Sequence, residues 1–371
     1  MRNTLLDEQR ANFRMPDLSR EKNLQGLLVK RPGDHFPEGI EELLEFKEAP
    51  LLKMEDVPDN HIYMKVLYTS VDPAMRMWMT GAKTYFKALH IGDIMHSFGI
   101  GQVIYSKYPA YEAGDLVYVN TGMQKYSLVN VGKAAHIFPI PPQGFGAHHY
   151  LNILGTNGST AYYGILKIGK PKKGETCVIS TAAGATGLIA CQIAKISGCR
   201  VVGICGSEEK CKFLKETLGI DEAINYKSPG NLVDKLKAAC PKGIDIYYDN
   251  VGEETLDAVL ANMNNKGRVA LAGVMSAYVD FPNRKGVSNY GAIVTKRIKL
   301  RGFLAFEAVN YFPEMVDYYK EALENGQMKS YEDVYYNLLD APKALKKLFK
   351  GENIGKLIFD LHSPLPPKSK L

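Results

Sequence analysis

The chain has 371 residues, of which 46% are hydrophobic and 23% charged, and its formal net charge is +6 at pH 7. This length suits about two globular domains of roughly 100 to 200 residues each. The basic residues are interspersed rather than clustered, which argues against nucleic acid as a partner, and no segment reaches the roughly 18 to 20 uninterrupted apolar residues of a membrane span.

Residues 1–22 mix acidic side chains with arginines, a pattern unlike a secretory signal or a mitochondrial presequence. We expect a flexible N-terminal arm there. Between residues 23 and 150, short alternating runs such as 61–69, 101–105 and 115–120 are separated by Gly, Pro and Asp. This spacing predicts an irregular antiparallel β barrel rather than βαβ units.

After residue 150 the pattern changes to alternating strands and helices. A buried strand at 176–181, a glycine-bearing turn, a helix at 188–197 and a strand at 200–205 form one complete βαβ unit. Further strands are expected at 223–226, 245–248, 268–272 and 300–305, and helices at 208–218, 232–239 and 254–263. The alternation predicts an α/β domain over 151–326, with a doubly wound parallel sheet.

The C-terminal part continues with a helix at 311–325, an extended run at 331–337, a helix at 341–349 and a strand at 356–360. We expect residues 327–362 to return and complete the barrel domain. A tail at 363–371 ends in Ser369-Lys370-Leu371, the tripeptide that the peroxisomal import receptor reads. The sequence therefore predicts peroxisomal localisation with this receptor as a partner, and cytoplasmic residence is the alternative.

The turn between the first parallel strand and its helix is the strongest functional signal. Gly184 would let the backbone approach a pyrophosphate, Gly187 would let helix and strand pack closely, and the helix N-terminus offers unpaired N–H groups. Ala182 replaces the first glycine of the usual fingerprint, so the turn depends on its strand–turn–helix–strand context. The residues expected to contact a dinucleotide here are Ala183, Gly184, Ala185, Thr186 and Gly187.

The second strand of this unit ends at Cys205-Gly206-Ser207, without the acidic residue that would hold the ribose 2′-hydroxyl of NAD. Lys210 follows within one helical turn and suits the 2′-phosphate of NADP. Glu208 and Glu209 leave NAD open, although acidic residues are also favoured in the first turn of any helix. We predict NADP as the cofactor.

Several segments together resemble the zinc-independent medium-chain dehydrogenase/reductases, and within them the leukotriene B4 dehydrogenase/prostaglandin reductase group. The resemblance covers about residues 25–360, and its segments occur in order at similar spacing. They are 71–76 (VDPAMR), 155–162 (GTNGSTAY), 182–187 (AAGATG), 207–210 (SEEK), 225–227 (NYK), 249–252 (DNVG) and 353–356 (NIGK).

The resemblance implies a GroES-like barrel plus a Rossmann domain, a homodimer, and NADPH-dependent reduction of the carbon–carbon double bond of α,β-unsaturated ketones or aldehydes. By position, Lys210 and Tyr226 would hold the 2′-phosphate. Tyr278 would be the catalytic residue, donating a hydrogen bond to the developing enolate while hydride reaches the β carbon. The other expected cofactor contacts are Asn250, Gly273, Phe303, Leu304 and Asn353.

Three alternatives remain at this point. A zinc alcohol dehydrogenase would need Cys or His ligands, but all six cysteines fall between residues 177 and 240, outside the barrel segment, and we expect no metal site. The cysteines are expected to be reduced, buried thiols of an intracellular protein. The other two alternative functions are NADPH-dependent quinone reduction and dinucleotide binding without catalysis.

Overall fold

The computed structural model describes residues 9–33, 36–81, 88–134, 137–140, 145–279 and 285–364. The chain divides into two compact units. Unit 1 comprises Met1–Leu151, Asp333–Lys350 and Leu357–Leu371, and unit 2 comprises Asn152–Glu332 and Gly351–Lys356. Within the described ranges, no helix combines the length and the apolar character that crossing a membrane requires.

Unit 2 is built on a six-stranded parallel sheet in the order β10-β9-β8-β11-β12-β13. Numbered along the unit this order is 3-2-1-4-5-6, the arrangement of a doubly wound Rossmann sheet, in which ligands bind where the strand order reverses. That reversal lies between β8 and β11. The strands are β8 (Thr176–Ser180), β9 (Arg200–Cys205), β10 (Glu222–Asn225), β11 (Ile244–Asp249), β12 (Met263–Leu271) and β13 (Lys299–Gly302).

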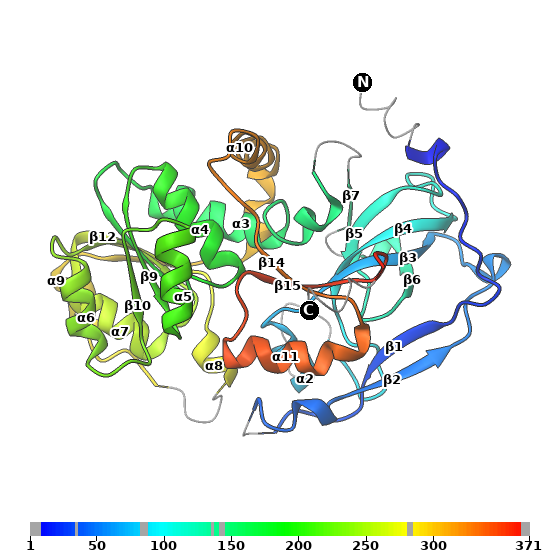
Figure 1. The fold of residues 1–371 in the computed structure, drawn as a ribbon, viewed down its shortest axis with the longest axis horizontal. Helices are drawn as coiled ribbons and strands as arrows, with labels where there is room; N and C mark the ends of the chain where they lie inside the picture. Colours follow the sequence, from blue (N-terminus) through cyan, green and yellow to red (C-terminus); the bar gives the residue numbers. More distant parts are fainter. Residues whose placement is uncertain are drawn as a thin grey trace. The chain divides into compact units, whose positions relative to one another are not determined.

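Helices connect these strands and precede or follow the sheet (Figure 1). The connecting helices are α4 (Ala185–Ile196), α5 (Glu208–Lys212) with the π-helix η6 (Phe213–Thr217), α6 (Leu232–Ala239), α7 (Glu253–Asn262), α8 (Met275–Val279) and α9 (Tyr290–Thr295). The others are α3 (Thr156–Tyr162), the π-helix η5 (Tyr163–Gly169), η7 (Ala305–Tyr311) and α10 (Phe312–Glu324).

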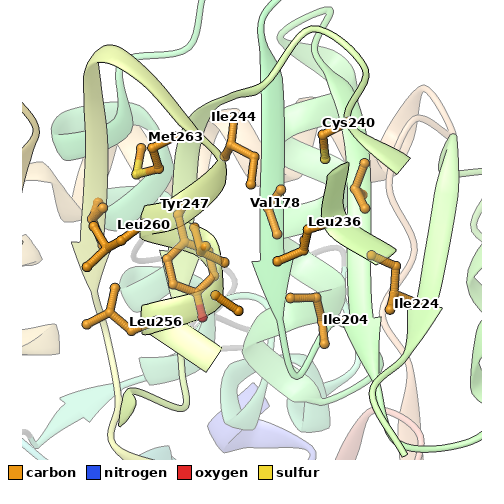
Figure 2. Close-up of a cluster of buried hydrophobic side chains, with 14 of the residues drawn as sticks. Val178, Ile204, Ile224, Leu236, Cys240, Ile244, Tyr247, Leu256, Leu260 and Met263 are labelled. Carbon is orange, nitrogen blue, oxygen red and sulfur yellow. The ribbon is translucent and has the colours of Figure 1, made fainter. Parts of the chain in front are cut away.

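One face of the parallel sheet carries a continuous apolar core. Val178 and Ile204 from the strands meet Leu236 from α6 and Leu260 from α7, and all four side chains are at most 2% exposed (Figure 2). Burial on this scale stabilises the unit by roughly 1.5 to 3 kcal/mol per large aliphatic side chain. The rigid sheet that results holds the carboxyl ends of its strands, and the loops that follow them, in one place.

Unit 1 contains an antiparallel sheet of seven strands, with β6 paired to β3 beside the path β14-β15-β3-β4-β5-β7, and a separate ribbon of β1 and β2 (Figure 1). β3 pairs with β6 through its first half and with β15 through its second half, and its register with β4 shifts twice. Such bulges bend a strand and let a sheet curve. The strands are β1 (Asn23–Leu28), β2 (Leu44–Ala49), β3 (His61–Ser70), β4 (Phe98–Ser106), β5 (Leu116–Asn120), β6 (Tyr126–Asn130), β7 (Phe138–Pro139), β14 (Glu332–Tyr335) and β15 (Lys356–Asp360).

Its helices are short apart from α11 (Ala341–Lys350), and they include α2 (Met75–Thr80). The 3₁₀ helices of unit 1 are η1 (Ile40–Glu42), η2 (Met54–Asp56), η3 (Val131–Lys133), η4 (Ala147–Leu151) and η8 (Leu338–Asp340).

The described part of the N-terminal arm departs from the expectation of a flexible segment. Arg10 forms a two-pronged ion pair with Asp115, whose side chain is 4% exposed, through bonds of 2.7 and 2.9 Å. Phe13 and Leu18 pack against a buried cluster that contains Tyr63 and Tyr126. Residues 9–22 therefore cover one face of the antiparallel sheet, because β3 is buried on both of its faces and needs a second apolar layer.

The compact units divide the C-terminal part differently from the predicted domains. Residues 327–332 and Gly351–Lys356 belong to unit 2, not to the barrel domain. The reason is a set of backbone contacts: Gly355 bridges to Gly184, and the Lys356 N–H donates to the Tyr331 carbonyl at 2.9 Å. Residues 351–356 therefore contact unit 2, and the strand β15 that follows continues into the sheet of unit 1.

Candidate dinucleotide-binding site

The N-terminus of α4 lies directly after β8, at the reversal of strand order. Gly184 is its N-cap residue and has no side chain to accept a hydrogen bond. By contrast, Ser207 and Asn231 accept hydrogen bonds from the first turns of α5 and α6. Since the first N–H groups of a helix have no partner within the helix and carry partial positive charge, α4 presents an anion-binding end.

The turn before α4 is compact because of two backbone features. Thr181 has a left-handed φ of +51°, uncommon for a residue other than glycine. A Cβ on Gly187 would lie 2.2 Å from the Thr181 carbonyl oxygen and 2.8 Å from the Ala182 Cα, so only glycine fits there. Gly187 thus permits the close helix–strand packing that the sequence predicted for it.

The segment Gly351–Lys356 closes over this turn. The Gly355 N–H donates to the Ala183 carbonyl at 2.9 Å. Gly355 has φ +77°, and a Cβ there would lie 2.2 Å from the Tyr331 carbonyl oxygen. Asn353 is 5% exposed, and its side-chain amide donates to the Gly355 carbonyl at 2.8 Å. The segment therefore brings Asn353 to the glycine turn, although 166 or more residues separate them in the chain.

Lys210 lies at the carboxyl end of the neighbouring strand β9. Its backbone N–H donates to the Ser207 hydroxyl at 3.3 Å, and its ammonium donates to the Gly351 carbonyl at 2.7 Å. The residue is 8% exposed. Because desolvating an ammonium is costly, a lysine buried to this degree needs a hydrogen-bond acceptor, which the Gly351 carbonyl provides. Lys210 also ties the segment Gly351–Lys356 to the β9 end of the sheet.

Tyr226 and Lys227 follow the end of β10 and lie beside the turn at Gly206 and Ser207, which connects β9 to α5. Tyr226 is half exposed, and a Cβ built on Gly206 would lie 3.3 Å from its ring and 3.4 Å from the Lys227 Cε. The Lys227 ammonium lies 5.8 Å from the centre of the Tyr226 ring. The carboxylate of Glu208 is held at 2.8 Å by the Asn225 side chain. The turn expected to receive a 2′-phosphate is therefore flanked by Lys210, Lys227, the phenol of Tyr226 and the carboxylate of Glu208.

Asn250 connects the ends of β8 and β11. Its side-chain amide donates to the Ser180 carbonyl at 2.7 Å, and its backbone N–H donates to the Ser180 hydroxyl at 2.9 Å. A Cβ on Gly273 would lie 3.0 Å from the Asn250 carbonyl oxygen, so Gly273 allows a close approach there. These contacts place both residues beside the reversal of strand order, and their expected contacts with a cofactor stay predictions.

Asp249 stabilises this corner from beneath. One of its carboxylate oxygens accepts hydrogen bonds from the Val251 and Gly252 N–H groups, each at 2.9 Å, and from the Tyr247 hydroxyl at 2.8 Å. The Ser180 hydroxyl is a fourth donor at 3.4 Å, yet the side chain is fully buried, and this burial raises the pKa of Asp249 despite the four donors. The carboxylate thus orders the loop that carries Asn250 rather than reaching a ligand.

Tyr278 lies on α8, which begins shortly after β12. Its N–H donates to the Val274 carbonyl at 3.3 Å, and the Ser276 hydroxyl anchors the helix on the Val251 carbonyl at 2.5 Å. After β13, Phe303 is 7% exposed and packs on Tyr163, while Leu304 is 39% exposed. The Leu304 N–H is held by the Glu307 carboxylate at 3.0 Å.

All of the predicted site residues follow the carboxyl ends of parallel strands or lie on the segment that returns to them. Direct contacts join Ala183 to the Gly351–Lys356 segment, that segment to Lys210, and Asn250 to the end of β8. Their roles toward a cofactor stay predictions. The sequence reasoning assigned no role to Gly355, Gly351 or Lys227, although Gly355 and Lys227 stood inside recognised segments.

Metal ligation has no support in the described parts of the chain. Across those ranges, no group of three or more His, Cys, Asp or Glu side chains is arranged to hold a metal ion. His35 and His136 fall outside them. The expectation that the protein needs no metal stays a prediction.

Comparison with known proteins identifies the family. Residues 185–321 match a model described as zinc-binding dehydrogenase, and residues 27–137 match one described as the N-terminal domain of oxidoreductase. The chain belongs to the medium-chain dehydrogenase/reductase family. The resemblance and the fold class that we predicted from the sequence are thereby confirmed.

Individual relatives place the chain within this family. It is similar to a 2-alkenal reductase (NADP(+)-dependent) of Nicotiana tabacum, with 39% identity over 85% of this chain and 91% of the relative. It is 35% identical to prostaglandin reductase 1 of Bos taurus, over 87% of this chain and 94% of that protein. The structure of CurA in complex with NADPH from Vibrio vulnificus matches with a TM-score of 0.83 and 32% identity, over 92% of this chain and 100% of that one.

Replacing Gly187 by alanine tests the close contact at the turn. Its Cβ would press on backbone atoms of Thr181 and Ala182, so we expect a loss of about 1 to 3 kcal/mol in unfolding free energy together with weaker NADPH binding. Gly291→Ala on α9 is the matched control, because nothing lies within 4 Å of its added Cβ. Thermal denaturation and NADPH titration of both variants check this; equal behaviour of the two would show that the turn relaxes freely.

Lys210→Ala tests the expected 2′-phosphate contact. Losing a charge-assisted hydrogen bond should cost on the order of 1.5 to 3 kcal/mol of NADPH binding and much less of NADH binding. Lys212→Ala, on the same helix and exposed, should change neither. Binding constants for both cofactors give the answer. An equal loss for NADPH and NADH would mean that Lys210 acts only by holding Gly351.

Proposed function

We propose that the protein is an NADPH-dependent reductase of α,β-unsaturated ketones and aldehydes. The observation that carries the proposal is the uncapped N-terminus of α4 beside the cations Lys210 and Lys227, within a chain 39% identical to a 2-alkenal reductase (NADP(+)-dependent). A pyrophosphate suits the helix end, and a 2′-phosphate suits the pair of lysines. NADP is therefore the cofactor.

The residues present fit this cofactor. Bound NADPH supplies a hydride for the β carbon of the substrate. The Thr181–Gly187 turn and α4 orient it through backbone N–H groups, and the Gly351–Lys356 segment with Asn353 holds the turn in position. Tyr278 is proposed to donate a hydrogen bond to the carbonyl oxygen, where negative charge grows as the double bond is reduced. No nucleophilic side chain takes part in this reaction.

An assay with matched substrates tests the function. NADPH consumption is followed with an aliphatic 2-alkenal, a conjugated ketone and a quinone, and a saturated aldehyde serves as the control. The product should be the saturated carbonyl compound, with deuterium from labelled NADPH on the β carbon, and an excess of chelator should not change the rate. An allylic alcohol as product would overturn the proposal.

The two alternative functions give different outcomes in the same assay. Activity on the quinone with none on the alkenal would identify a quinone reductase. Tight NADPH binding without turnover on any substrate would identify a dinucleotide-binding protein that is not an enzyme.

Tyr278→Phe tests the catalytic residue. Removal of one donor to a developing oxyanion lowers kcat on the order of 100-fold, while NADPH affinity should be nearly unchanged because the interaction belongs to the transition state. Tyr290→Phe, at a tyrosine that is 66% exposed, is the control and should keep full activity. Steady-state kinetics measure both, and an unchanged kcat in Tyr278→Phe would remove this residue from the mechanism.

We further propose that the protein forms a homodimer, as the family resemblance implies. β13 ends the parallel sheet, and an edge strand offers unpaired N–H and C=O groups to a second copy. The neighbouring helix α9 exposes Tyr290 and Val294 at 66% and 68%. A two-fold axis beside β13 would make the two surfaces mutually complementary. Light scattering of the intact chain measures the mass directly.

Finally, Ser369-Lys370-Leu371 lies outside the described residues, and we propose that it directs peroxisomal import where it forms a free carboxyl terminus. A chain tagged at its N-terminus should enter peroxisomes, and removal of Leu371 should leave it in the cytosol. Fluorescence microscopy of the two versions gives the comparison. Diffuse cytosolic signal from both would show that the tripeptide is not an address.

A further inference from the structure

Two cysteines contact each other at the junction of β9 and α5, the helix that carries Lys210. Cys205 is the last residue of β9, and Cys211 lies on α5, six residues later. Their sulfur atoms are 3.3 Å apart, and the residues are 4% and 7% exposed. All six cysteines lie in described residues and are free and buried, and among them this is the pair whose sulfur atoms are in contact.

We propose that Cys205 and Cys211 form an intramolecular disulfide under oxidising conditions, and that this disulfide weakens NADPH binding. The proposal rests on the function proposed above, because it requires that the turn between the two cysteines receives the 2′-phosphate. It concerns a modification site that plays no part in the reduction of a double bond.

The geometry favours this bond over any other between the cysteines. A disulfide has an S–S length of about 2.05 Å, so the two sulfur atoms must approach by little more than an ångström from their contact distance. The intervening residues can yield. Gly206 has no side chain, α5 is only five residues long, and the helix continues as the π-helix η6, whose wider turns are less regular.

Closing the bond would disturb the residues inside the ring that it forms. Lys210 directly precedes Cys211, and its N–H depends on the Ser207 hydroxyl at 3.3 Å. Its ammonium depends on a position from which it reaches the Gly351 carbonyl at 2.7 Å. Pulling Cys211 toward β9 moves Lys210 relative to both partners. The affinity for a 2′-phosphate should fall more than the affinity for the rest of the dinucleotide.

A hydroperoxide is the oxidant that converts the two thiols to the disulfide. The Cys205 thiolate attacks the terminal peroxide oxygen and breaks the O–O bond, which yields a sulfenic acid and, after protonation, an alcohol, or water where the oxidant is hydrogen peroxide. The Cys211 sulfur then attacks the Cys205 sulfur, so that the S–S bond forms and the hydroxyl leaves as water. Two thiols lose two electrons and two protons, and the hydroperoxide is reduced.

Electrostatics set the order and the speed of these steps. Burial raises the pKa of both thiols, that of Cys211 to about 12. At Cys205 the neighbouring Cys211 thiol and the charge of Lys210 oppose this rise, so Cys205 is the better candidate for the attacking thiolate. Since only the thiolate reacts, oxidation should be slow at neutral pH and faster as the pH rises toward these pKa values.

The experiment uses the full chain treated with hydrogen peroxide and then freed of excess oxidant. Mass spectrometry should show the loss of two hydrogen atoms and a link between the peptides that carry Cys205 and Cys211, with the other four cysteines still open to alkylation after denaturation. NADPH affinity, measured by titration, should fall on the order of tenfold, as for one weakened charge-assisted contact, with a smaller change for NADH. Dithiothreitol should restore both values.

Matched variants separate this disulfide from general damage. Cys211→Ser should keep its NADPH affinity after peroxide treatment. Cys199→Ser, at a cysteine equally buried but outside the pair, should respond like the parent chain. Absence of the Cys205–Cys211 link in the parent, or a complete link with unchanged NADPH affinity, would overturn the proposal. Because mass and binding are measured without a substrate, these results are independent of whether enones are reduced.

Discussion

The uncapped N-terminus of α4 is the feature on which the organisation of unit 2 depends. A helix of twelve residues ends there in N–H groups that no side chain of the N-cap residue satisfies, directly where the strand order of the sheet reverses. The parallel strands bring every following loop to the same edge, so Lys210, Asn250 and the residues after β12 and β13 all lie along the edge that carries this positive helix end. The core shown in Figure 2 keeps that edge rigid.

Lys210 gives this edge a second property, because it serves two partners. Its ammonium donates to the carbonyl of Gly351, in the segment that carries Asn353, and its backbone N–H donates to the Ser207 hydroxyl. A ligand phosphate would compete with that carbonyl for the Lys210 ammonium, or share the ammonium with it. If Lys210 binds the 2′-phosphate as proposed, recognition at the 2′ position is coupled to the position of the Gly351–Lys356 segment, which a lysine on the surface would not achieve.

Much of unit 2 could be predicted from the sequence because its elements are local and strongly patterned. β9 and β15 have the bounds expected from their buried runs, and Gly187 was assigned the close packing that the structure shows. What failed depends on single contacts between distant residues. Arg10 and Asp115 are 105 residues apart, and their ion pair attaches an arm that composition alone describes as loose. The periodicity of apolar residues predicts neither this ion pair nor the contact of residues 351–356 with unit 2.

The turn after β9 could be predicted only in part from the sequence, for the same reason. The missing acidic residue and the presence of Lys210 are visible in the sequence, but the role of Glu208 is not. The structure shows that its carboxylate accepts a hydrogen bond from the Asn225 side chain at 2.8 Å. In the proposed 2′-phosphate site, selectivity would thus depend on the neutral amide of Asn225 on the neighbouring strand as well as on the cations. Counting charges along the sequence leaves the choice between NAD and NADP open at this turn, because it cannot show that the Glu208 carboxylate has a hydrogen-bond partner of its own in Asn225.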